Sequence, residues 1–492
     1  MMTITQRKPT LTELLPISQE LLPRQVLEEL VKASGKTFYE RLFSPMVILW
    51  GLIYQRLNAD HTCDAALSYL SSGSVDHLDR TQQRPLSARI KSTSTAAYCK
   101  ARKRLPLSVL QGALGHTGDV IRSGLDEGGK WRGHSVGLLD GSTLYLSPEP
   151  ELVAHYGRHQ NGQGQTYWVV MRVVVAFCLR TAALLGVAEG PLSSSEQGLA
   201  KTVLAQAQPN SLYLGDSNFG IFSVAQAARH YGVGLLLRLT QQRAQALANR
   251  HLRSGEEIQV CWSPSKADKL DPDMAALPLP GRLIYIRLER DGFRPVDLYL
   301  FTTLLDAQRY PLEALVELYG WRWHVELDLR YVKSTLDMDH LTAKTVDMIR
   351  KELFAGLVAY NLIRGYMAQA AHHAHLSPLT LSFSRCWRRV AEMLHTLRST
   401  DPSQKIVQVT TRLFDQLART KLPQRKPFRI EPRAIRGQPK VYPYFKGSRQ
   451  EARQKVVQQR LQPKTRAKPV QNLLELPQLL LQLPAACQQQ PL

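Results

Sequence analysis

Hydrophobic positions in the first 130 residues recur at helical spacing, and few runs alternate with the period of a strand. The clearest amphipathic runs are Arg24–Ala33, Pro45–Asn58 and Cys63–Ser71. A tyrosine surrounded by cations follows in the segment AYCKARKRLP. We predict a helical N-terminal domain over residues 1–130, with this basic run as either a solvated face or a DNA-binding segment.

The pattern changes at Trp131, where apolar runs of strand length begin. Strands are predicted at Ser135–Leu146, at Tyr167–Cys178, which is rich in β-branched residues, and at Ala183–Glu189. Short connections join the last two runs, so we expect an antiparallel meander.

Three further elements follow in the order strand, helix, strand. They are Ser211–Gly215, Phe222–Tyr231 and Val233–Thr240. This order is typical of a parallel pair. Three antiparallel strands followed by such a pair predict an α/β fold with a ribonuclease-H-like mixed sheet, of which residues 131–240 form the first part.

Residues 241–304 depart from this order. Gly255–Cys261, Arg282–Glu289 and Val296–Thr302 read as strands around a loop rich in proline. We interpret this segment as a β-rich insertion. Residues 305–400, which are mainly helical in pattern, would then complete the catalytic core.

A single helix is predicted over Pro311–Leu336, because proline opens it and good helix formers follow. At 100° per residue, five polar side chains share one narrow stripe: Tyr319, Arg322, Glu326, Arg330 and Lys333. An apolar stripe lies beside it: Leu318, Val325, Leu329, Val332 and Leu336. Taken alone, the polar stripe is better explained as a solvated face with an ion pair between Glu326 and Arg330.

Periodicity fades after Asp401. The segment Lys421–Lys468 has fifteen Lys and Arg residues against two acids, and proline is spaced through it. We expect residues 401–492 to form a basic, partly disordered tail that orders on an anionic partner.

Charge narrows the choice of partner. The chain of 492 residues has 63 Lys and Arg and 41 Asp and Glu, which gives a net charge of +22. This excess favours a polyanion, and double-stranded DNA is the leading candidate. No signal peptide, membrane span or lipid anchor is evident, and six scattered cysteines fit a reducing compartment, so we expect a cytoplasmic protein without membrane attachment.

Three acids stand at positions where this fold would bring them together. Asp140 lies in the first strand, Asp216 ends a later strand, and Glu326 lies on the predicted helix. Clustered carboxylates repel one another, and Mg²⁺ is suited to oxygen ligands of this kind. Each acid also has a plainer explanation: Asp140 as a turn residue, Asp216 as a helix cap and Glu326 as half of an ion pair.

These residues resemble the Asp-Asp-Glu transposases of bacterial insertion sequences, in the insertion-sequence-four family. The family signature of Tyr, Arg, Glu and Lys at fixed spacing is met by Tyr319, Arg322, Glu326 and Lys333. DGSTL around Asp140, LGDSNFG, AYNLIR and STAAYCKARKRLP also match, and the resemblance covers roughly residues 90 to 445.

The resemblance implies cut-and-paste transposition, with cleavage at the transposon ends and strand transfer into target DNA, in related members through a hairpin. It implies that Asp140, Asp216 and Glu326 bind two Mg²⁺ ions, which Mn²⁺ can replace. Tyr319, Arg322 and Lys333 would hold phosphates, and Arg330 sits where a further cation could do so. A DNA-bound homodimer is expected. A ribonuclease-H-like nuclease without strand transfer and a non-catalytic DNA-binding derivative remain as alternatives.

Overall fold

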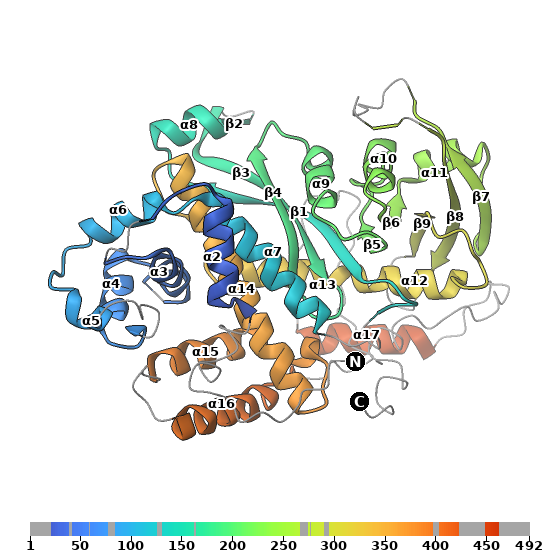
Figure 1. Cartoon of the computed structure of the whole chain (residues 1–492). Coiled ribbons are helices and arrows are strands. Elements are labelled where there is room, and N and C mark those ends of the chain that lie inside the picture. The colour runs from blue at the N-terminus through green and yellow to red at the C-terminus, as the bar shows by residue number, and fades with distance from the viewer. Residues whose placement is uncertain are drawn as a thin grey trace. The chain divides into compact units, whose positions relative to one another are not determined.

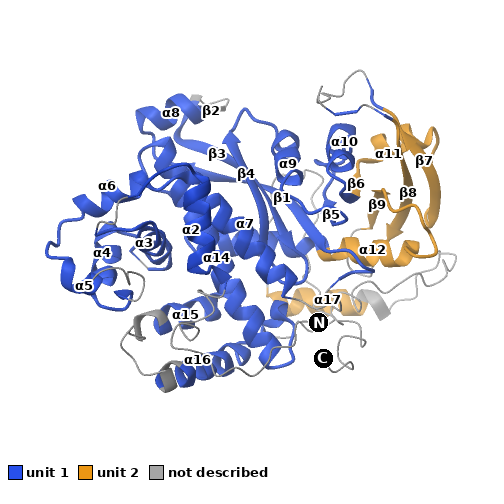
Figure 2. Ribbon diagram, viewed as in Figure 1, with its two compact units in different colours: residues 1–235, 264–277, 322–422 blue, residues 236–263, 278–321, 423–492 orange. Residues whose placement is uncertain are grey.

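The computed structural model is a mixed α/β protein (Figure 1). It describes residues 21–38, 42–58, 60–76, 84–124, 130–161, 164–265, 274–275, 277–289, 295–396, 403–422 and 448–461. These residues divide into two compact units, which are coloured in Figure 2. Unit 1 comprises Met1–Leu235, Pro264–Leu277 and Arg322–Leu422, and unit 2 comprises Leu236–Ser263, Pro278–Trp321 and Pro423–Leu492.

The described residues before the sheet are helical. The helices are α2 (Arg24–Ala33), α3 (Pro45–Leu57), α4 (Cys63–Ser71), α5 (Leu86–Arg89), α6 (Ala96–Arg104) and α7 (Leu107–Ser123). Local chemistry explains two of the starts, because Ser44 and Thr62 accept hydrogen bonds from Val47 N and Ala65 N. All six helices belong to the same compact unit as the first strands.

The sheet of unit 1 is built on the predicted meander. Strand β1 (Val136–Leu146) pairs antiparallel with β3 (Gly164–Cys178), and β3 pairs antiparallel with β4 (Leu184–Pro191) and with the short β2 (Arg158–Asn161). The three strands expected from the pattern are therefore confirmed. The helix α8 (Pro150–Tyr156) connects β1 to β2.

The other edge of β1 carries two parallel partners. Strand β5 (Leu212–Gly215) pairs with its beginning and β10 (His340–Leu341) with its end. The helix α9 (Glu196–Leu204) precedes β5, and α10 (Phe222–His230) follows it. The sheet thus contains both parallel and antiparallel pairs, as the sequence predicted.

A long buried helix organises the rest of unit 1. The 28-residue α14 (Val346–His373) packs on α3, α7, α15 (Phe383–Thr396) and α16 (Ser403–Ala418). In Figure 1, α7 and α14 lie together against β4. Because α14 is buried over most of its circumference, it carries apolar residues on nearly every face.

The expectation that an extended tail begins at Asp401 is wrong for residues 403–422. They form α16 and a short stretch in which Leu422 N donates to Thr380 O at 2.7 Å. Leu413 and Leu417 are buried at 4% and 0% exposure, and their four-residue spacing is the helical signal that the sequence interpretation passed over. The rest of the basic segment lies outside the described residues except for α17 (Arg449–Leu461).

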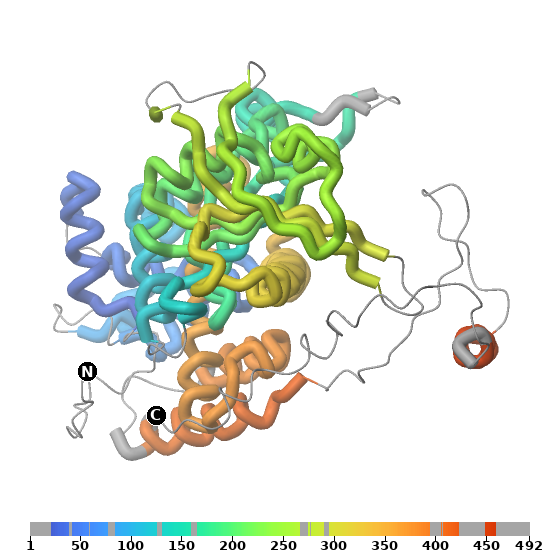
Figure 3. The backbone as a smooth tube through the Cα atoms, turned by 90° about the vertical axis from the view of Figure 1, so that its right-hand side faces the viewer, coloured from blue at the N-terminus to red at the C-terminus, as the bar shows by residue number. Residues whose placement is uncertain are grey.

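Unit 2 contains the predicted β-rich segment. Its strands run in the order β6 (Gly234–Leu239), β9 (Val296–Thr302), β8 (Leu279–Leu288) and β7 (Glu256–Trp262), with antiparallel pairing throughout. Strands β7, β8 and β9 lie side by side in Figure 3. The three predicted strands are confirmed, and β9 adds directly to β6. Helices α11 (Gln241–Ala248) and α12 (Leu312–Gly320) belong to the same unit.

The predicted helix Pro311–Leu336 is helical throughout but is not a single α-helix. After α12 the chain makes a 3-10 turn at Trp321–Trp323, then α13 (His324–Arg330), and then a π-helical turn at Tyr331–Thr335. The predicted apolar stripe is buried in all five positions, at exposures from 0% to 9%. Hydrophobic spacing identifies the buried face, but a change of helix type over three to five residues is too short to alter it visibly.

Candidate active site

The pairing of β1 with β5 brings two aspartates to neighbouring positions. The parallel ladder ends where Leu138 pairs with Leu214, two residues before each aspartate, so Asp140 and Asp216 follow paired positions of adjacent strands. Adjacent strands lie about 4.8 Å apart, and parallel strands present equivalent positions at the same end of a sheet. Two residues 76 positions apart in the chain are therefore brought to the same region of the sheet.

Asp140 is mostly buried, and its surroundings change its acidity. Burial raises the pKa of its carboxyl to about 6, which the guanidinium of Arg322 and the hydrogen bond from Gly141 N oppose. The negative charges of Asp216 and Glu326 act in the same direction as burial. The three acids singled out from the sequence are therefore within electrostatic range of one another.

Arg322 lies between two of these acids. Its Nη2 donates to Glu326 Oε1 at 3.3 Å, and its Nη1 is 4.0 Å from Asp140 Oδ2. The arginine is buried at 8% exposure, whereas the Glu326 side chain is 49% exposed. Next to Arg322, Trp323 is 62% exposed, with the guanidinium 5.6 Å from its ring centroid.

The remaining members of the predicted polar stripe have different environments. Lys333 forms an ion pair with Asp339, with 2.9 Å between Nζ and Oδ1. Arg330 is exposed and lies over the ring of Tyr331. Tyr319 belongs to unit 2 and is buried at 6% exposure. The stripe is thus a set of separate sites along three types of helix.

A fourth acid lies beside Asp140 that the sequence interpretation missed. A side-chain carbon added to Gly141 would lie 2.8 Å from the carboxyl group of Glu196. Glu196 accepts a hydrogen bond from Asn218 Nδ2, and its Oε1 is 3.8 Å from Arg172 Nε. Close packing against the Glu196 carboxyl group is thus one reason for a glycine at this position of β1.

The segment after the second aspartate has a defined structure. Asn218 N donates to Asp216 Oδ1 at 2.9 Å, which orients the carboxylate from its own loop. Gln197 Nε2 donates to Asn218 Oδ1 at 2.6 Å. Asn218 therefore links the aspartate to the first turn of α9. The sequence signal was present in the LGDSNFG segment, but nothing local identifies Gln197 or Glu196 as its partners.

The AYNLIR segment on α14 forms hydrogen bonds with the elements that surround the site. Arg364 Nη2 donates to Asp328 Oδ1 at 2.5 Å, and both side chains are buried. Tyr360 donates to Ala182 O at 2.8 Å, and Asn361 Oδ1 accepts from Leu184 N at 2.8 Å. These contacts join the helix of Glu326 and the β3–β4 turn to one buried helix.

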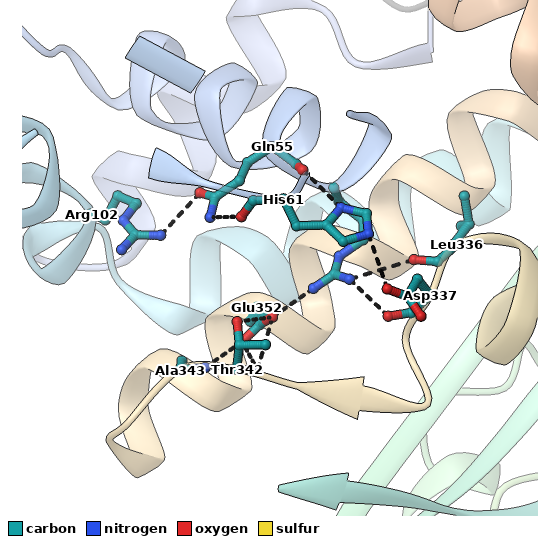
Figure 4. A network of polar contacts seen from close by, with 9 residues as sticks. Gln55, His61, Arg102, Leu336, Asp337, Thr342, Ala343 and Glu352 are labelled. Atoms are coloured by element: carbon teal, nitrogen blue, oxygen red, sulfur yellow. Dashed lines mark hydrogen bonds and ion pairs between the residues drawn. The ribbon is translucent and has the colours of Figure 1, made fainter. Parts of the chain in front are cut away.

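A network of polar contacts connects α3 with the segment that follows the signature, where Figure 4 labels Leu336, Asp337 and Glu352. Arg56 Nη1 donates to the carbonyls of Leu336 and Asp337 at 3.4 and 3.0 Å, and its Nη2 donates to Glu352 Oε1 at 2.6 Å. Glu352 also accepts from Thr342 N at 3.1 Å. Asp337 has a φ of 52°, a left-handed conformation that these contacts stabilise.

The basic run before the sheet forms α6. Lys100, Lys103 and Arg104 are exposed, whereas Arg102 Nη1 donates to Gln55 Oε1 at 3.0 Å. Three of its four cations therefore face solvent, where phosphate could reach them. Gln55 is next to Arg56, so α6 and the segment after the signature are held by adjacent residues of α3.

The donor set suits a hard divalent cation, because three carboxylates contribute oxygen atoms. In the arrangement seen here, however, no three Asp, Glu, His or Cys side chains within the described part of the chain are close enough to share a metal ion. The guanidinium of Arg322 lies between Asp140 and Glu326 in this arrangement, 4.0 Å from the first carboxylate and 3.3 Å from the second.

Comparisons with known proteins find relatives among the transposases. A family model described as a transposase DDE domain matches residues 131–362. The transposase InsG of insertion sequence element IS4 from Escherichia coli K12 is 27% identical over 357 residues, which cover 71% of this chain and 78% of the relative. A probable transposase of insertion sequence element IS5377 from Geobacillus stearothermophilus is 32% identical over 89 residues, 18% of this chain and 23% of that protein.

A solved structure of the piggyBac transposase in a synaptic complex with hairpin DNA aligns with a TM-score of 0.40 and 9% identity, over 82% of this chain and 85% of that one. No helix in the described residues is long and apolar enough to cross a membrane. The family match begins at Trp131, where the hydrophobic pattern changes, and it includes both aspartates, the signature residues and most of AYNLIR. The chain therefore contains a match to a transposase DDE domain and is similar over most of its length to a transposase of insertion sequence element IS4.

Proposed function

We propose that this transposase cleaves DNA at the ends of its element and joins the freed ends to target DNA, using Asp140, Asp216 and Glu326 as ligands for divalent metal ions. The observation that carries the proposal is geometric: β1 and β5 pair two residues before Asp140 and Asp216, and Arg322 contacts Glu326 while lying 4.0 Å from Asp140. Carboxylates held close together in a partly buried place repel one another and lower the stability of the fold. Such arrangements are typical of functional sites.

Mg²⁺ is the expected metal, and Mn²⁺ is expected to substitute. When bound, a pair of ions would activate the attacking oxygen and stabilise the leaving oxygen of an in-line displacement at phosphorus. The chain itself orients the carboxylates: Gly141 N donates to Asp140, and Asn218 N donates to Asp216. The buried pair of Asp328 and Arg364 restrains the helix on which Glu326 stands.

DNA phosphates are the expected partners of the signature cations. Arg322 offers a planar group suited to bidentate phosphate contact, and Lys333 offers a point charge. Arg330 is exposed beside them. Tyr319 is retained as a proposed DNA contact by resemblance alone, since its side chain is buried within unit 2.

We assign residues 131–240 and 305–400 to a ribonuclease-H-like catalytic core, supported by an antiparallel meander followed by a strand parallel to β1. Residues 241–304 are the proposed insertion, residues 1–130 a proposed DNA-binding domain, and residues 401–492 a basic segment in which α16 is ordered. A homodimer bound to both ends of the element, in the bacterial nucleoid, completes the proposal.

The test compares isosteric substitutions of the three acids. Asp140→Asn, Asp216→Asn and Glu326→Gln should each reduce cleavage of the element's end by at least 10³-fold, while binding of the same DNA changes little, because removing a metal ligand affects the transition state far more than docking. Glu313→Gln, an exposed acid on the preceding helix, is the matched control and should retain normal cleavage. Normal cleavage by Glu326→Gln would refute the assignment.

Products formed from precut ends distinguish the alternatives. Joined molecules with a supercoiled target identify strand transfer. Cleavage without joining would instead indicate a nuclease, and DNA binding without either product would indicate a non-catalytic derivative. Gel analysis of the cleaved end also detects a hairpin, because a hairpin migrates as a strand of double length under denaturing conditions.

A further inference from the structure

The two cations that the signature places nearest the acids are both neutralised within the protein. Arg322 contacts Glu326 at 3.3 Å and lies 4.0 Å from Asp140, and Lys333 pairs with Asp339 at 2.9 Å. A residue that serves only to bind DNA would be expected to project toward solvent. Arg322 instead is buried and points its charge at two proposed metal ligands.

The guanidinium of Arg322 and a metal ion would compete for the same two carboxylates. A neighbouring positive charge stabilises an ionised carboxylate. In the free protein, Arg322 therefore provides part of the electrostatic stabilisation that a metal ion would provide. A divalent cation arriving beside it would meet a like charge in a poorly solvated place. Arg322 therefore weakens metal binding for as long as it remains between Asp140 and Glu326.

A DNA phosphate can remove this obstacle. Phosphate is a strong bidentate acceptor for arginine, and the half-exposed Glu326 leaves the outer side of the pair open to a ligand. Withdrawal of Arg322 toward a phosphate would leave the carboxylates uncompensated, and metal ions would then bind more tightly. By thermodynamic linkage, the metal would strengthen DNA binding by the same factor.

We propose that Arg322 is a resident counter-ion of the acidic triad in the free protein, and that its transfer to a DNA phosphate couples metal loading to DNA binding. This inference rests on the proposed function, because it takes Asp140 and Glu326 as metal ligands. Its consequence is a transposase that assembles its metal site on DNA and holds metal weakly when no DNA is bound.

The test measures Mn²⁺ binding to the full-length protein by electron paramagnetic resonance of the free ion. It is run without DNA and with DNA duplexes copied from the sequence immediately outside each end of the gene. Wild-type protein should bind Mn²⁺ at least tenfold more tightly when the duplex is present. Arg322→Gln should bind Mn²⁺ at least tenfold more tightly than wild type without DNA, and the duplex should add less than threefold.

Three variants separate charge from folding and background. Arg322→Met also removes the charge, at similar volume, and should give the same result as Arg322→Gln. The test therefore remains usable if one of these two variants folds poorly. Arg322→Lys keeps a charge and should stay within threefold of wild type without DNA. Arg309→Gln removes an exposed cation that is not among the proposed DNA contacts, and it should leave Mn²⁺ binding unchanged. Melting curves by circular dichroism identify which variants are folded.

The outcomes distinguish this inference from the proposed function. If Arg322→Gln and Arg322→Met bind Mn²⁺ no more tightly than wild type without DNA, while Asp140→Asn abolishes the Mn²⁺ site, the coupling is wrong and the triad stands. If neither wild type nor the Arg322 variants bind Mn²⁺ with or without DNA, the metal assignment itself fails, and the coupling fails with it.

Discussion

Arg364 and Asp328 form a buried ion pair, with 2.5 Å between Nη2 and Oδ1. Asp328 is two residues after the proposed metal ligand Glu326 on the same helix. The guanidinium of Arg364 also lies 4.8 Å from the ring centroid of Phe383, and it is close to the rings of Tyr331 and Tyr360. A buried charge that loses its partner is strongly destabilising, whereas replacing both charges by apolar groups costs much less.

We therefore predict that Asp328→Leu lowers the free energy of unfolding by about 3–5 kcal/mol. The double substitution Asp328→Leu with Arg364→Met should recover most of this loss, as measured by urea denaturation. The double variant should still cleave DNA more slowly than wild type, because Glu326 has lost an anchor for its helix. Equal stability of the single and double variants would contradict this account.

The ion pair between Lys333 and Asp339 predicts a gain in DNA affinity on substitution. Asp339→Asn frees Lys333 for phosphate, so binding of duplex DNA should strengthen by about three- to tenfold, with a salt dependence steeper by about one phosphate contact. Fluorescence anisotropy at several salt concentrations measures both quantities. Asp337→Asn is the control, because it removes a nearby negative charge whose side chain is 73% exposed and pairs with His61. A similar gain in that variant would show that charge alone is responsible.

Arg56 should determine the order of the segment that follows the signature. Arg56→Ala removes three hydrogen bonds from a buried guanidinium and leaves Glu352 without its cation, so we expect a loss of about 2–4 kcal/mol in stability. Amide hydrogen exchange over residues 336–343 should accelerate more than exchange in β3. Arg24→Ala, which breaks an exposed pair with Glu28, should change neither quantity measurably. Uniform acceleration across the chain would instead indicate global destabilisation.

The basic C-terminal segment should contribute to DNA binding independently of the fold. Removing residues 423–492 deletes most of the fifteen cations of Lys421–Lys468 and should flatten the salt dependence of DNA binding. Thermal stability of unit 1 should be retained, because α16 remains. Removing residues 401–492 should in addition destabilise the protein, since Leu413 and Leu417 are buried. An unchanged salt slope in the shorter deletion would count against a DNA role for this segment.

The raised pKa of Asp140 predicts a conflict between stability and function. Its folded pKa of about 6 is above the ordinary value, so the folded protein holds this proton more tightly than the unfolded chain does. Stability from this group is present at low pH and is lost as pH rises toward and through about 6. Asp140→Asn should therefore melt on the order of 2–4 °C higher than wild type at pH 8 without metal, and the difference should shrink below pH 6. A lower melting temperature at pH 8 would contradict the prediction.

The sequence determined the elements of this protein well where hydrophobic spacing is strong. The meander, the strands of the β-rich segment and the buried face of the helix after Pro311 all follow from local periodicity, because burial imposes that periodicity on the chain. The signature from Tyr319 to Lys333 is likewise a local pattern, so it identified the family from the sequence. Spacing could not separate α-helix from the 3-10 and π turns, since three to five residues carry too little pattern.

Only the tertiary structure decided which charges meet. Arg322 with Asp140 and Arg364 with Asp328 depend on pairs of elements whose contact no local pattern encodes. Glu196 was missed for the same reason: it faces Gly141 across the gap between a helix and a strand. Hydrophobic burial is non-directional and leaves a periodic trace in the sequence, whereas an ion pair needs two particular atoms at short distance and leaves none.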